Sequence, residues 1–154
     1  MPSSPTLDRM KVAFLTLGCR VNQAESSVLE GTLKENGVTI VGIDENPDYC
    51  IVNTCSVTAK GDYNSRQVIR RAVRSGARVL VSGCYAQVSP SEVSAIPGVA
   101  EIFPNSDKFR IINRVLGRNI PAVYASHGRS RPHVKVQDGC NFSCSYCIVP
   151  SARG

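Results

Sequence analysis

Three apolar runs that each lead to a cysteine constrain the fold of this chain more than any other feature. The runs are KVAFLTL at 11–17, YCIVN at 49–53 and RVLVSG at 78–83. Each is short, branched and apolar enough for a buried strand. The cysteines that follow them are Cys19, Cys55 and Cys84. Each of these cysteines is therefore predicted in the loop directly after a strand.

Helical stretches separate the apolar runs, and this alternation predicts an α/β fold with a doubly wound, mostly parallel sheet. Strands are expected at 11–17, 38–43, 49–53, 78–82, 100–103 and 120–124, and helices at 24–36, 59–75, 89–96 and 107–116. In such sheets, ligands bind beyond the carboxyl ends of the strands. Cys19, Cys55 and Cys84 are therefore expected to converge at that edge.

The residues alone leave two interpretations of these three cysteines open. Thiolates on neighbouring loops can hold an iron–sulfur cluster, and Gly18 and Gly83, which lack a Cβ atom, would let a bulky ligand approach the backbone. Free cysteine is also among the most buried residue types and needs no ligand to explain it. Cys50, inside a predicted strand, is expected to be of this second, structural kind.

A second group of cysteines, Cys140, Cys144 and Cys147, has the spacing CxxxCxxC. Three thiolates on one loop can bind three irons of a four-iron cluster and leave the fourth iron open to a small molecule, which favours an enzyme. Structural zinc usually takes two separated ligand pairs, and a bacterial ferredoxin loop runs CxxCxxC with a fourth ligand near a proline. Neither pattern fits, and the remaining alternative is coincidence.

The residues around this loop resemble the radical S-adenosylmethionine superfamily and, within it, the methylthiotransferase family. The superfamily pattern CxxxCxΦC has an aromatic residue at Φ, here Tyr146, and the flanking QDGC and YCIVPSARG sharpen the match. TLGCRVNQAES, VNTCSVTAKGDYNSRQ and VSGCYAQ resemble the three cysteine motifs of the methylthiotransferase amino-terminal domain. VNQ and NTCSVTAK are most similar to the branch that acts on threonylcarbamoyladenosine in tRNA, rather than the branches for isopentenyladenosine or a ribosomal protein.

The resemblance implies a first four-iron cluster in the second cysteine group. Cys140, Cys144 and Cys147 would hold this cluster, which binds S-adenosylmethionine and reduces it to a 5′-deoxyadenosyl radical. Tyr146 would lie near the adenine of S-adenosylmethionine. The reductant implied by the family is a protein such as flavodoxin or ferredoxin.

The resemblance also implies an auxiliary four-iron cluster, held by Cys19, Cys55 and Cys84. This cluster would carry sulfur, supplied by a sulfur donor, for C2 methylthiolation of threonylcarbamoyladenosine 37 in the tRNA anticodon loop. The alternative from another class of protein is an iron–sulfur or zinc RNA-binding module with no reaction of its own.

The predicted organisation is a polar tail at 1–9, the α/β domain at 10–124, a linker at 125–132 and the start of a radical S-adenosylmethionine domain at 133–154. A strand at 133–137 is expected to lead into the cluster loop. A complete β/α barrel takes about 250 residues. The sequence is therefore interpreted as an amino-terminal fragment, predicted to have no methylthiotransferase activity by itself.

Charge and composition limit the partners. The 154 residues carry a net charge of +6, which permits an acidic partner such as RNA. Arg66, Arg70 and Arg74 recur every four residues, so they share a helix face that either binds phosphates or is simply solvated. No run approaches the roughly eighteen apolar residues of a membrane span. The polar start and the odd count of seven cysteines predict a cytoplasmic protein with no membrane partner.

Overall fold

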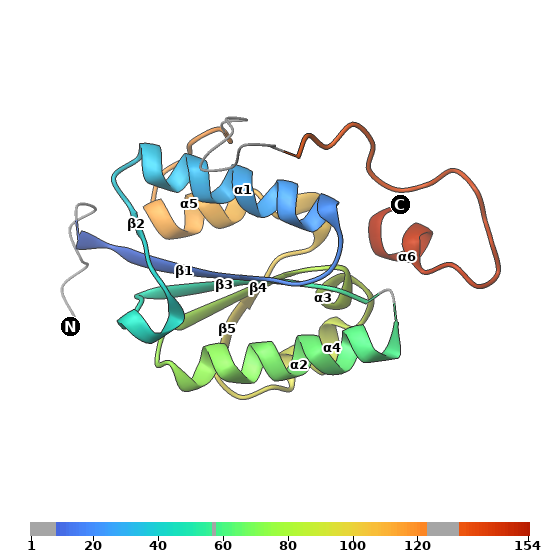
Figure 1. Cartoon of the computed structure of the whole chain (residues 1–154), viewed down its shortest axis with the longest axis horizontal. Helices are drawn as coiled ribbons and strands as arrows, with labels where there is room; N and C mark the ends of the chain where they lie inside the picture. Colours follow the sequence, from blue (N-terminus) through green and yellow to red (C-terminus); the bar gives the residue numbers. More distant parts are fainter. Residues whose placement is uncertain (1–8, 57, 123–132) are drawn as a thin grey trace.

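A five-stranded, all-parallel sheet is the centre of the computed structural model, which describes residues 9–56, 58–122 and 133–154 (Figure 1). The strands lie in the order β2-β1-β3-β4-β5. Their bounds are Lys11–Thr16 (β1), Thr39–Ile40 (β2), Tyr49–Thr54 (β3), Arg78–Gly83 (β4) and Val99–Ile102 (β5). Every described pair of neighbouring strands is parallel. The predicted α/β class with a parallel sheet is confirmed.

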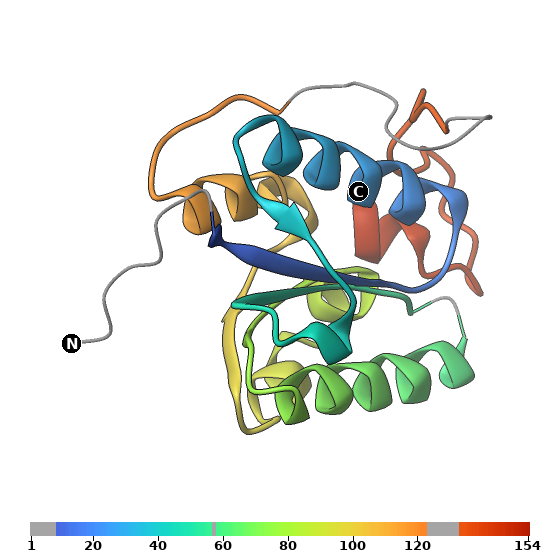
Figure 2. The ribbon, with the colours of Figure 1, turned by 60° about the vertical axis from the view of Figure 1, so that its left-hand side comes forward.

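Helices cover both faces of this sheet (Figure 2). One face carries α1 (Arg20–Glu35) and α5 (Arg110–Leu116), and the other carries α2 (Ala59–Arg74), α3 (Cys84–Val88) and α4 (Pro90–Ser94). Two short 3-10 turns, η2 (Ile43–Glu45) and η3 (Asn105–Asp107), and a final helix, α6 (Val149–Arg153), complete the described elements. None of the described helices is both long and apolar enough to cross a membrane.

Strand β3 shows why helices cover both faces of the sheet. Ile51 contributes to the apolar cluster beneath α1 and α5, whereas Cys50 and Val52 contribute to the cluster beneath α2 and α4. Successive side chains of a strand point to opposite faces, so a strand covered on both faces is apolar throughout. Cys50 is fully buried, and this burial raises the pKa of its thiol to about 12. It is a core residue, as predicted.

Several boundaries differ from those predicted by the sequence. Helix α1 begins at Arg20 instead of residue 24, because polar residues occupy buried positions in its first turns and hide the apolar pattern. The strand predicted at 38–43 is reduced to Thr39–Ile40 and is followed by η2. The helix predicted at 107–116 begins only at Arg110, after η3. Helices α3 and α6 have five residues each, too few for a periodic signal.

Two predicted strands do not form in the described part of the chain. Residues 120–122 are in no strand, and Ile120 and Ala122 pack on the cluster beneath α1 and α5; 123–124 fall outside the described residues. The strand predicted at 133–137 is also wrong. Its Val134 and Val136 are exposed, and a strand requires a partner for its backbone groups.

Two segments of the predicted domain organisation lie largely or wholly outside the described residues. The predicted linker at 125–132 and all but the last residue of the predicted tail at 1–9 fall outside the described residues. The boundaries of the predicted domains therefore stay predictions.

The topology and register of the sheet create a site at its carboxyl edge. The order of the strands reverses direction between β1 and β3, and such a switch point opens a crevice beyond the strand ends. Thr16 pairs with Asn53, and Asn53 pairs with Ser82, so three polar residues form one row across the end of the sheet. Helix α6 lies beyond this row and packs against α3 (Figure 1).

Gly83 at the end of β4 should not tolerate a side chain. Its φ is +101°, and a Cβ atom would lie 2.4 Å from both the backbone nitrogen and oxygen of Thr54. We expect Gly83→Ala to lower the free energy of unfolding by about 3 kcal/mol, the sum of a forbidden conformation and overpacking. Urea denaturation followed by circular dichroism measures this loss.

Gly76 provides the matched control for this substitution. Its φ is +80°, but a Cβ atom there would meet nothing within 4 Å. Gly76→Ala should therefore cost only about 1 kcal/mol, from the backbone conformation alone. Equal losses in the two variants would show that the contact with Thr54 does not restrict position 83.

Candidate functional site

Cys19, Cys55 and Cys84 lie at the carboxyl ends of three neighbouring strands. Cys19 is the N-cap of α1, Cys55 follows β3, and Cys84 is the first residue of α3. They follow the polar row of Thr16, Asn53 and Ser82 by only two or three residues. The sheet therefore brings the three cysteine loops to one edge, at and beside the switch point.

The loop of Cys55 contacts the loop of Cys19 closely. A Cβ atom at Gly18, which has a φ of +88°, would lie 2.8 Å from both the Cβ and the Sγ of Cys55. Only glycine leaves room for the thiol here. The backbone nitrogen of Cys55 donates to Ser65 Oγ over 3.1 Å, and that hydroxyl donates to the carbonyl of Cys55 over 2.9 Å. Helix α2 thereby fixes the Cys55 loop against Gly18.

Thr54 connects the Cys55 loop to the Cys84 turn. Its hydroxyl donates to the carbonyl of Ser82 over 2.7 Å and accepts from the backbone nitrogen of Ala86 over 3.2 Å. Ser82 Oγ, in the same place, is buried and has no hydrogen-bond partner among the described residues. Buried hydroxyls normally have a hydrogen-bond partner, so Ser82 Oγ is available to a further group at this strand end.

The donor chemistry of this edge fits an iron–sulfur cluster. All seven cysteines are free thiols; Cys19 is exposed, Cys55 half-buried and Cys84 buried. Within the described ranges, no three His, Cys, Asp or Glu side chains converge closely enough to hold a single metal ion. A four-iron cluster is larger than one ion, and its usual protein ligands are thiolates. The role of the three cysteines as its ligands stays a prediction.

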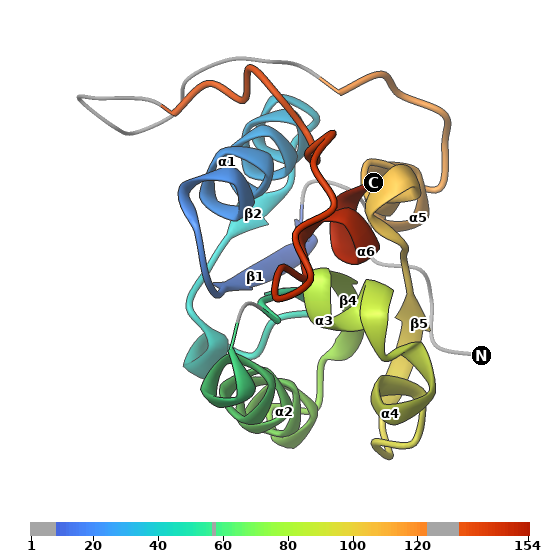
Figure 3. The same cartoon turned by 90° about the vertical axis from the view of Figure 1, so that its right-hand side faces the viewer.

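The second cysteine group lies on a loop in front of the same edge, between α1 and α3 (Figure 3). The backbone nitrogen of Cys140 donates to the carbonyl of Gly154 over 3.0 Å, which closes the loop, and that of Cys147 donates to the carbonyl of Cys144 over 3.1 Å. Tyr146 is 91% exposed, so its ring is open to a ligand. Helix α6, which follows Cys147, packs on α3, which begins at Cys84.

A buried network of charges around Glu25 joins this loop to the α/β domain. Glu25 lies in α1 and is only 3% exposed. Its carboxylate forms an ion pair with Lys108, which is 1% exposed, and accepts from Arg153 Nη1 over 2.9 Å and from Lys135 Nζ over 3.0 Å. Arg153 and Lys135 also pair with Asp138, over 3.0 and 3.1 Å. The network therefore spans both sides of the Cys140–Cys147 loop.

The pKa shifts in this network follow from burial and charge. Burial would raise the pKa of Glu25, but its hydrogen bond to Arg153 and the charge of Lys108 lower it from 4.5 to about 2. Burial lowers the pKa of Lys108, although Glu25 opposes that change. Burial also lowers the pKa of Arg153, but its hydrogen bonds to Glu25 and Asp138 and the charge of Glu25 together outweigh burial and raise that pKa. Glu25 is thus ionised at neutral pH.

The sequence carries a signal for this network in the spacing of residues along α1. Glu25, Leu29 and Leu33 are spaced by four, and both leucines belong to the apolar core. A carboxylate in the apolar stripe of a helix must be buried, and a buried charge needs a partner of opposite charge.

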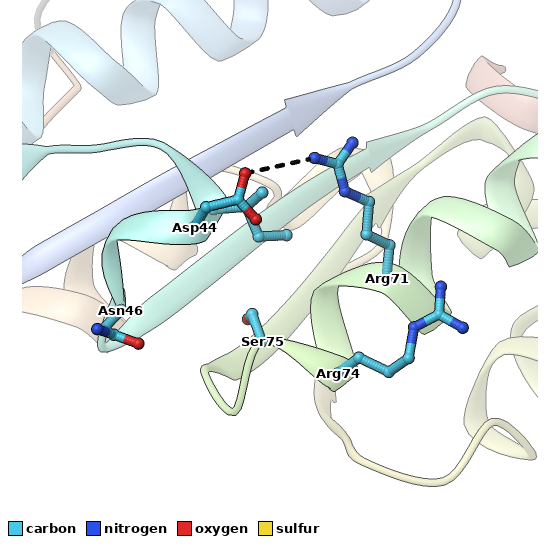
Figure 4. A pocket seen from close by; sticks show the side chains of 6 residues that line it. Asp44, Asn46, Arg71, Arg74 and Ser75 are labelled. Atoms are coloured by element: carbon cyan, nitrogen blue, oxygen red, sulfur yellow. Dashed lines mark ion pairs between the residues drawn. The ribbon is translucent and has the colours of Figure 1, made fainter.

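The arginines of helix α2 differ in their exposure and in their partners. Arg66 donates to the hydroxyl of Tyr85 over 3.1 Å and pairs with Glu92 over 3.6 Å, so it faces the protein. Arg74 is exposed and lines a shallow pocket of about 360 Å³ with Arg71, which pairs with Asp44 over 3.8 Å (Figure 4). This pocket lies at the end of α2 that leads into β4, away from both cysteine groups. Phosphate binding by α2 stays a hypothesis.

The fold and site define a doubly wound α/β domain with cysteines at its switch point and a further cysteine loop docked beside them. A family model described as "Uncharacterized protein family UPF0004" matches residues 11–104, and the chain belongs to this family, the amino-terminal domain of methylthiotransferases. The match covers all five strands and the first cysteine group.

Curated relatives agree with this assignment. The chain is 40% identical to the threonylcarbamoyladenosine tRNA methylthiotransferase MtaB of Bacillus subtilis, over 93% of this chain and 36% of the relative. It is 36% identical to MtaB of Aquifex aeolicus, over 94% of this chain and 40% of the relative. The ribosomal protein uS12 methylthiotransferase RimO of Aquifex aeolicus is 33% identical, over 94% and 34%. The chain thus spans about 34–40% of the length of these relatives.

Stability should depend on pH through Glu25. A folded-state pKa of about 2, against 4.5 for the ordinary carboxyl, corresponds to about 3 kcal/mol of stability that is present above pH 4.5 and lost as the pH falls toward 2. About 2 kcal/mol of it should be lost between pH 6 and pH 3. Urea denaturation of the wild type and of Glu25→Gln at both pH values isolates this contribution.

Glu25→Gln should also be less stable than the wild type at pH 6 by about 3–5 kcal/mol, because Lys108 and Arg153 lose their buried counter-charge. Glu101→Gln is the control, since Glu101 pairs with Arg114 over 2.8 Å at the surface and should contribute less than about 1 kcal/mol. Parallel pH dependences in the wild type and Glu25→Gln would contradict a lowered pKa at Glu25.

Proposed function

We propose that this chain is the cluster-binding part of a radical S-adenosylmethionine methylthiotransferase that modifies threonylcarbamoyladenosine in tRNA. The observation that carries the proposal is the position of the two cysteine groups. Cys84 begins a helix that packs on the helix after Cys147, so the two groups lie in neighbouring elements at one edge of the sheet. A reaction that needs two metal centres close together is consistent with this arrangement.

The residues at this edge have distinct roles in the proposed site. Cys19, Cys55 and Cys84 would hold an auxiliary cluster, and the exposed Tyr146 is available to contact an adenine ring. Gly18 keeps the Cys55 thiol next to the Cys19 loop. When bound, the cofactors would supply the radical and sulfur chemistry that no side-chain acid or base provides at an unactivated aromatic carbon.

The second cysteine group would hold the other cluster. Cys140, Cys144 and Cys147 lie on a loop that is closed by the hydrogen bond from Cys140 to Gly154. Three ligands would leave one iron open to S-adenosylmethionine. The protein itself contributes ligation and orientation, while the sulfur donor, the reductant and a cytoplasmic location stay predictions.

The choice of substrate rests on the relatives and on the motif variants. Two relatives that are 36–40% identical carry names for activity on threonylcarbamoyladenosine in tRNA, whereas the RimO relative acts on a ribosomal protein. VNQ after Cys19 and NTCSVTAK around Cys55 favour the tRNA branch. Isopentenyladenosine in tRNA and a ribosomal protein are the alternative substrates, and a non-catalytic iron–sulfur RNA-binding module is the alternative function.

Metal content tests the two-cluster arrangement. After anaerobic reconstitution of the full-length enzyme we expect about eight irons and eight sulfides per polypeptide, since each group of three cysteines would hold one four-iron cluster. Replacing Cys19, Cys55 and Cys84 together with alanine should leave about four irons, and so should replacing Cys140, Cys144 and Cys147. Cys50→Ala is the control, because Cys50 is buried in the core. Four irons in the unmodified chain would reject the proposal.

Modified nucleosides test the substrate. The full-length enzyme, expressed in a bacterium that lacks its own tRNA methylthiotransferases, should produce 2-methylthio-threonylcarbamoyladenosine, detected by mass spectrometry of digested tRNA. Cys144→Ala should abolish the product, because only two of the three thiolates that would hold the cluster remain. A methylthio group on isopentenyladenosine or on a ribosomal protein instead would assign another branch. No product, and no release of 5′-deoxyadenosine from S-adenosylmethionine, would favour the binding module.

A further inference from the structure

We propose that Glu25 and Arg153 form a latch that fixes the Cys140–Cys147 loop over the carboxyl edge of the sheet. Both are positioning residues for the reaction proposed above, on which this inference rests. The latch comprises Glu25 and Asn22 of α1, Lys108 before α5, and Asp138 and Arg153 on either side of the loop.

The guanidinium of Arg153 is the centre of the latch. Its Nη1 donates to Glu25 Oε1 over 2.9 Å and to Asp138 Oδ1 over 3.0 Å, and its Nη2 donates to Glu25 Oε2 over 3.2 Å and to Asn22 Oδ1. The side chain is only 7% exposed. A planar fork binds both oxygens of a carboxylate in a fixed geometry and still reaches other acceptors, whereas the ammonium of lysine is a point charge without that geometry. One side chain therefore holds both ends of the loop against α1.

Asn22 of α1, which accepts from Arg153, also holds the loops of Cys19 and Cys55. Asn22 Nδ2 donates to the carbonyl of Leu17 over 2.9 Å and to that of Thr54 over 2.8 Å, so it bonds to residues just before Cys19 and Cys55. Asn53 Nδ2 donates to the carbonyl of Asn22 over 3.0 Å. Any displacement of Arg153 from Asn22 and Glu25 is thus a displacement of one cysteine group relative to the other.

Polar contacts hold the Cys140–Cys147 loop itself, whereas α6 after it packs against α3. Neither apolar cluster includes a described residue of the segment 133–154, and Val134, Phe142 and Tyr146 in that segment are exposed. A second tie, from Asn105 Nδ2 to the carbonyl of Ala152 over 2.6 Å, lies next to the latch. Ala152 is buried and α6 packs against α3, so apolar contact holds the end of the segment, while the loop before α6 is placed by these hydrogen bonds and ion pairs.

The charges of the latch make Arg153 the informative residue to change. Without Arg153, Glu25 keeps Lys108 as a buried partner, and Lys135 still bridges Glu25 and Asp138. Arg153→Gln should therefore loosen the loop at its α6 end and leave the α/β domain folded. Glu25→Gln, in contrast, leaves the buried cations Lys108 and Arg153 without their counter-charge, which affects both the α/β domain and the loop.

Hydrogen–deuterium exchange of the reduced, metal-free chain tests the latch directly. In Arg153→Gln, amides of 139–154 should exchange about tenfold faster, because the loop opens more often. The amide of Cys140, which donates to Gly154, should be among them, while amides of β3 and β4 should be unchanged. Arg153→Lys should be intermediate. Arg114→Gln, which removes the surface pair with Glu101, is the control and should leave the loop unchanged. Unchanged exchange of 139–154 in Arg153→Gln would overturn the latch.

The ratio of the two products in the reconstituted full-length enzyme distinguishes a positioning role of Arg153 from a purely structural one. Arg153→Gln keeps all the cysteines, so its iron content should equal that of the wild type. Methylthiolated product per 5′-deoxyadenosine should fall about tenfold, because misplaced centres cleave S-adenosylmethionine without transferring sulfur. An unchanged ratio would overturn the positioning role. A wild type that releases no 5′-deoxyadenosine would instead overturn the proposed function, and the exchange result would still decide whether the latch exists.

Discussion

A carboxylate away from water is stable only when cations and hydrogen-bond donors surround it, and Glu25 imposes this condition on the whole carboxyl edge of the sheet. Its partners come from three distant parts of the chain: Lys108, Lys135 and Arg153. Lys108 compensates the charge within the domain, and Lys135 and Arg153 add cations from the two sides of the cysteine loop. The position of α1 therefore determines where the residue before α5 and both ends of the cysteine loop must lie.

The same edge illustrates how a parallel sheet combines a stable core with an adaptable site. Inside the sheet, apolar residues such as Ile51 and Val52 fill both faces. At the strand ends, side chains replace strand-to-strand hydrogen bonds, as when Asn22 donates to the carbonyls of Leu17 and Thr54. These polar contacts fix the loops while leaving the cysteine thiols free.

The sequence predicted the elements whose residues repeat a simple pattern. β3 and β4 were placed to within one residue, because strands buried on both faces are continuous apolar runs. A strand was also predicted at 133–137, but the sequence does not show whether a partner strand is present. The Glu25 network was not predicted, because Lys108 and Arg153 are 83 and 128 residues away from it. Contacts at such distances depend on the complete fold.

Buried ion pairs often add little net stability, because the cost of removing the charges from water offsets much of their attraction. Their geometry is nevertheless specific, since the bidentate contact of Arg153 with Glu25 forms in only one relative orientation. An apolar contact of equal area would hold the loop in many nearby positions, because the hydrophobic effect is not directional. We interpret the charges at this edge as selected for the placement of two cysteine groups, which an apolar contact could stabilise but not orient.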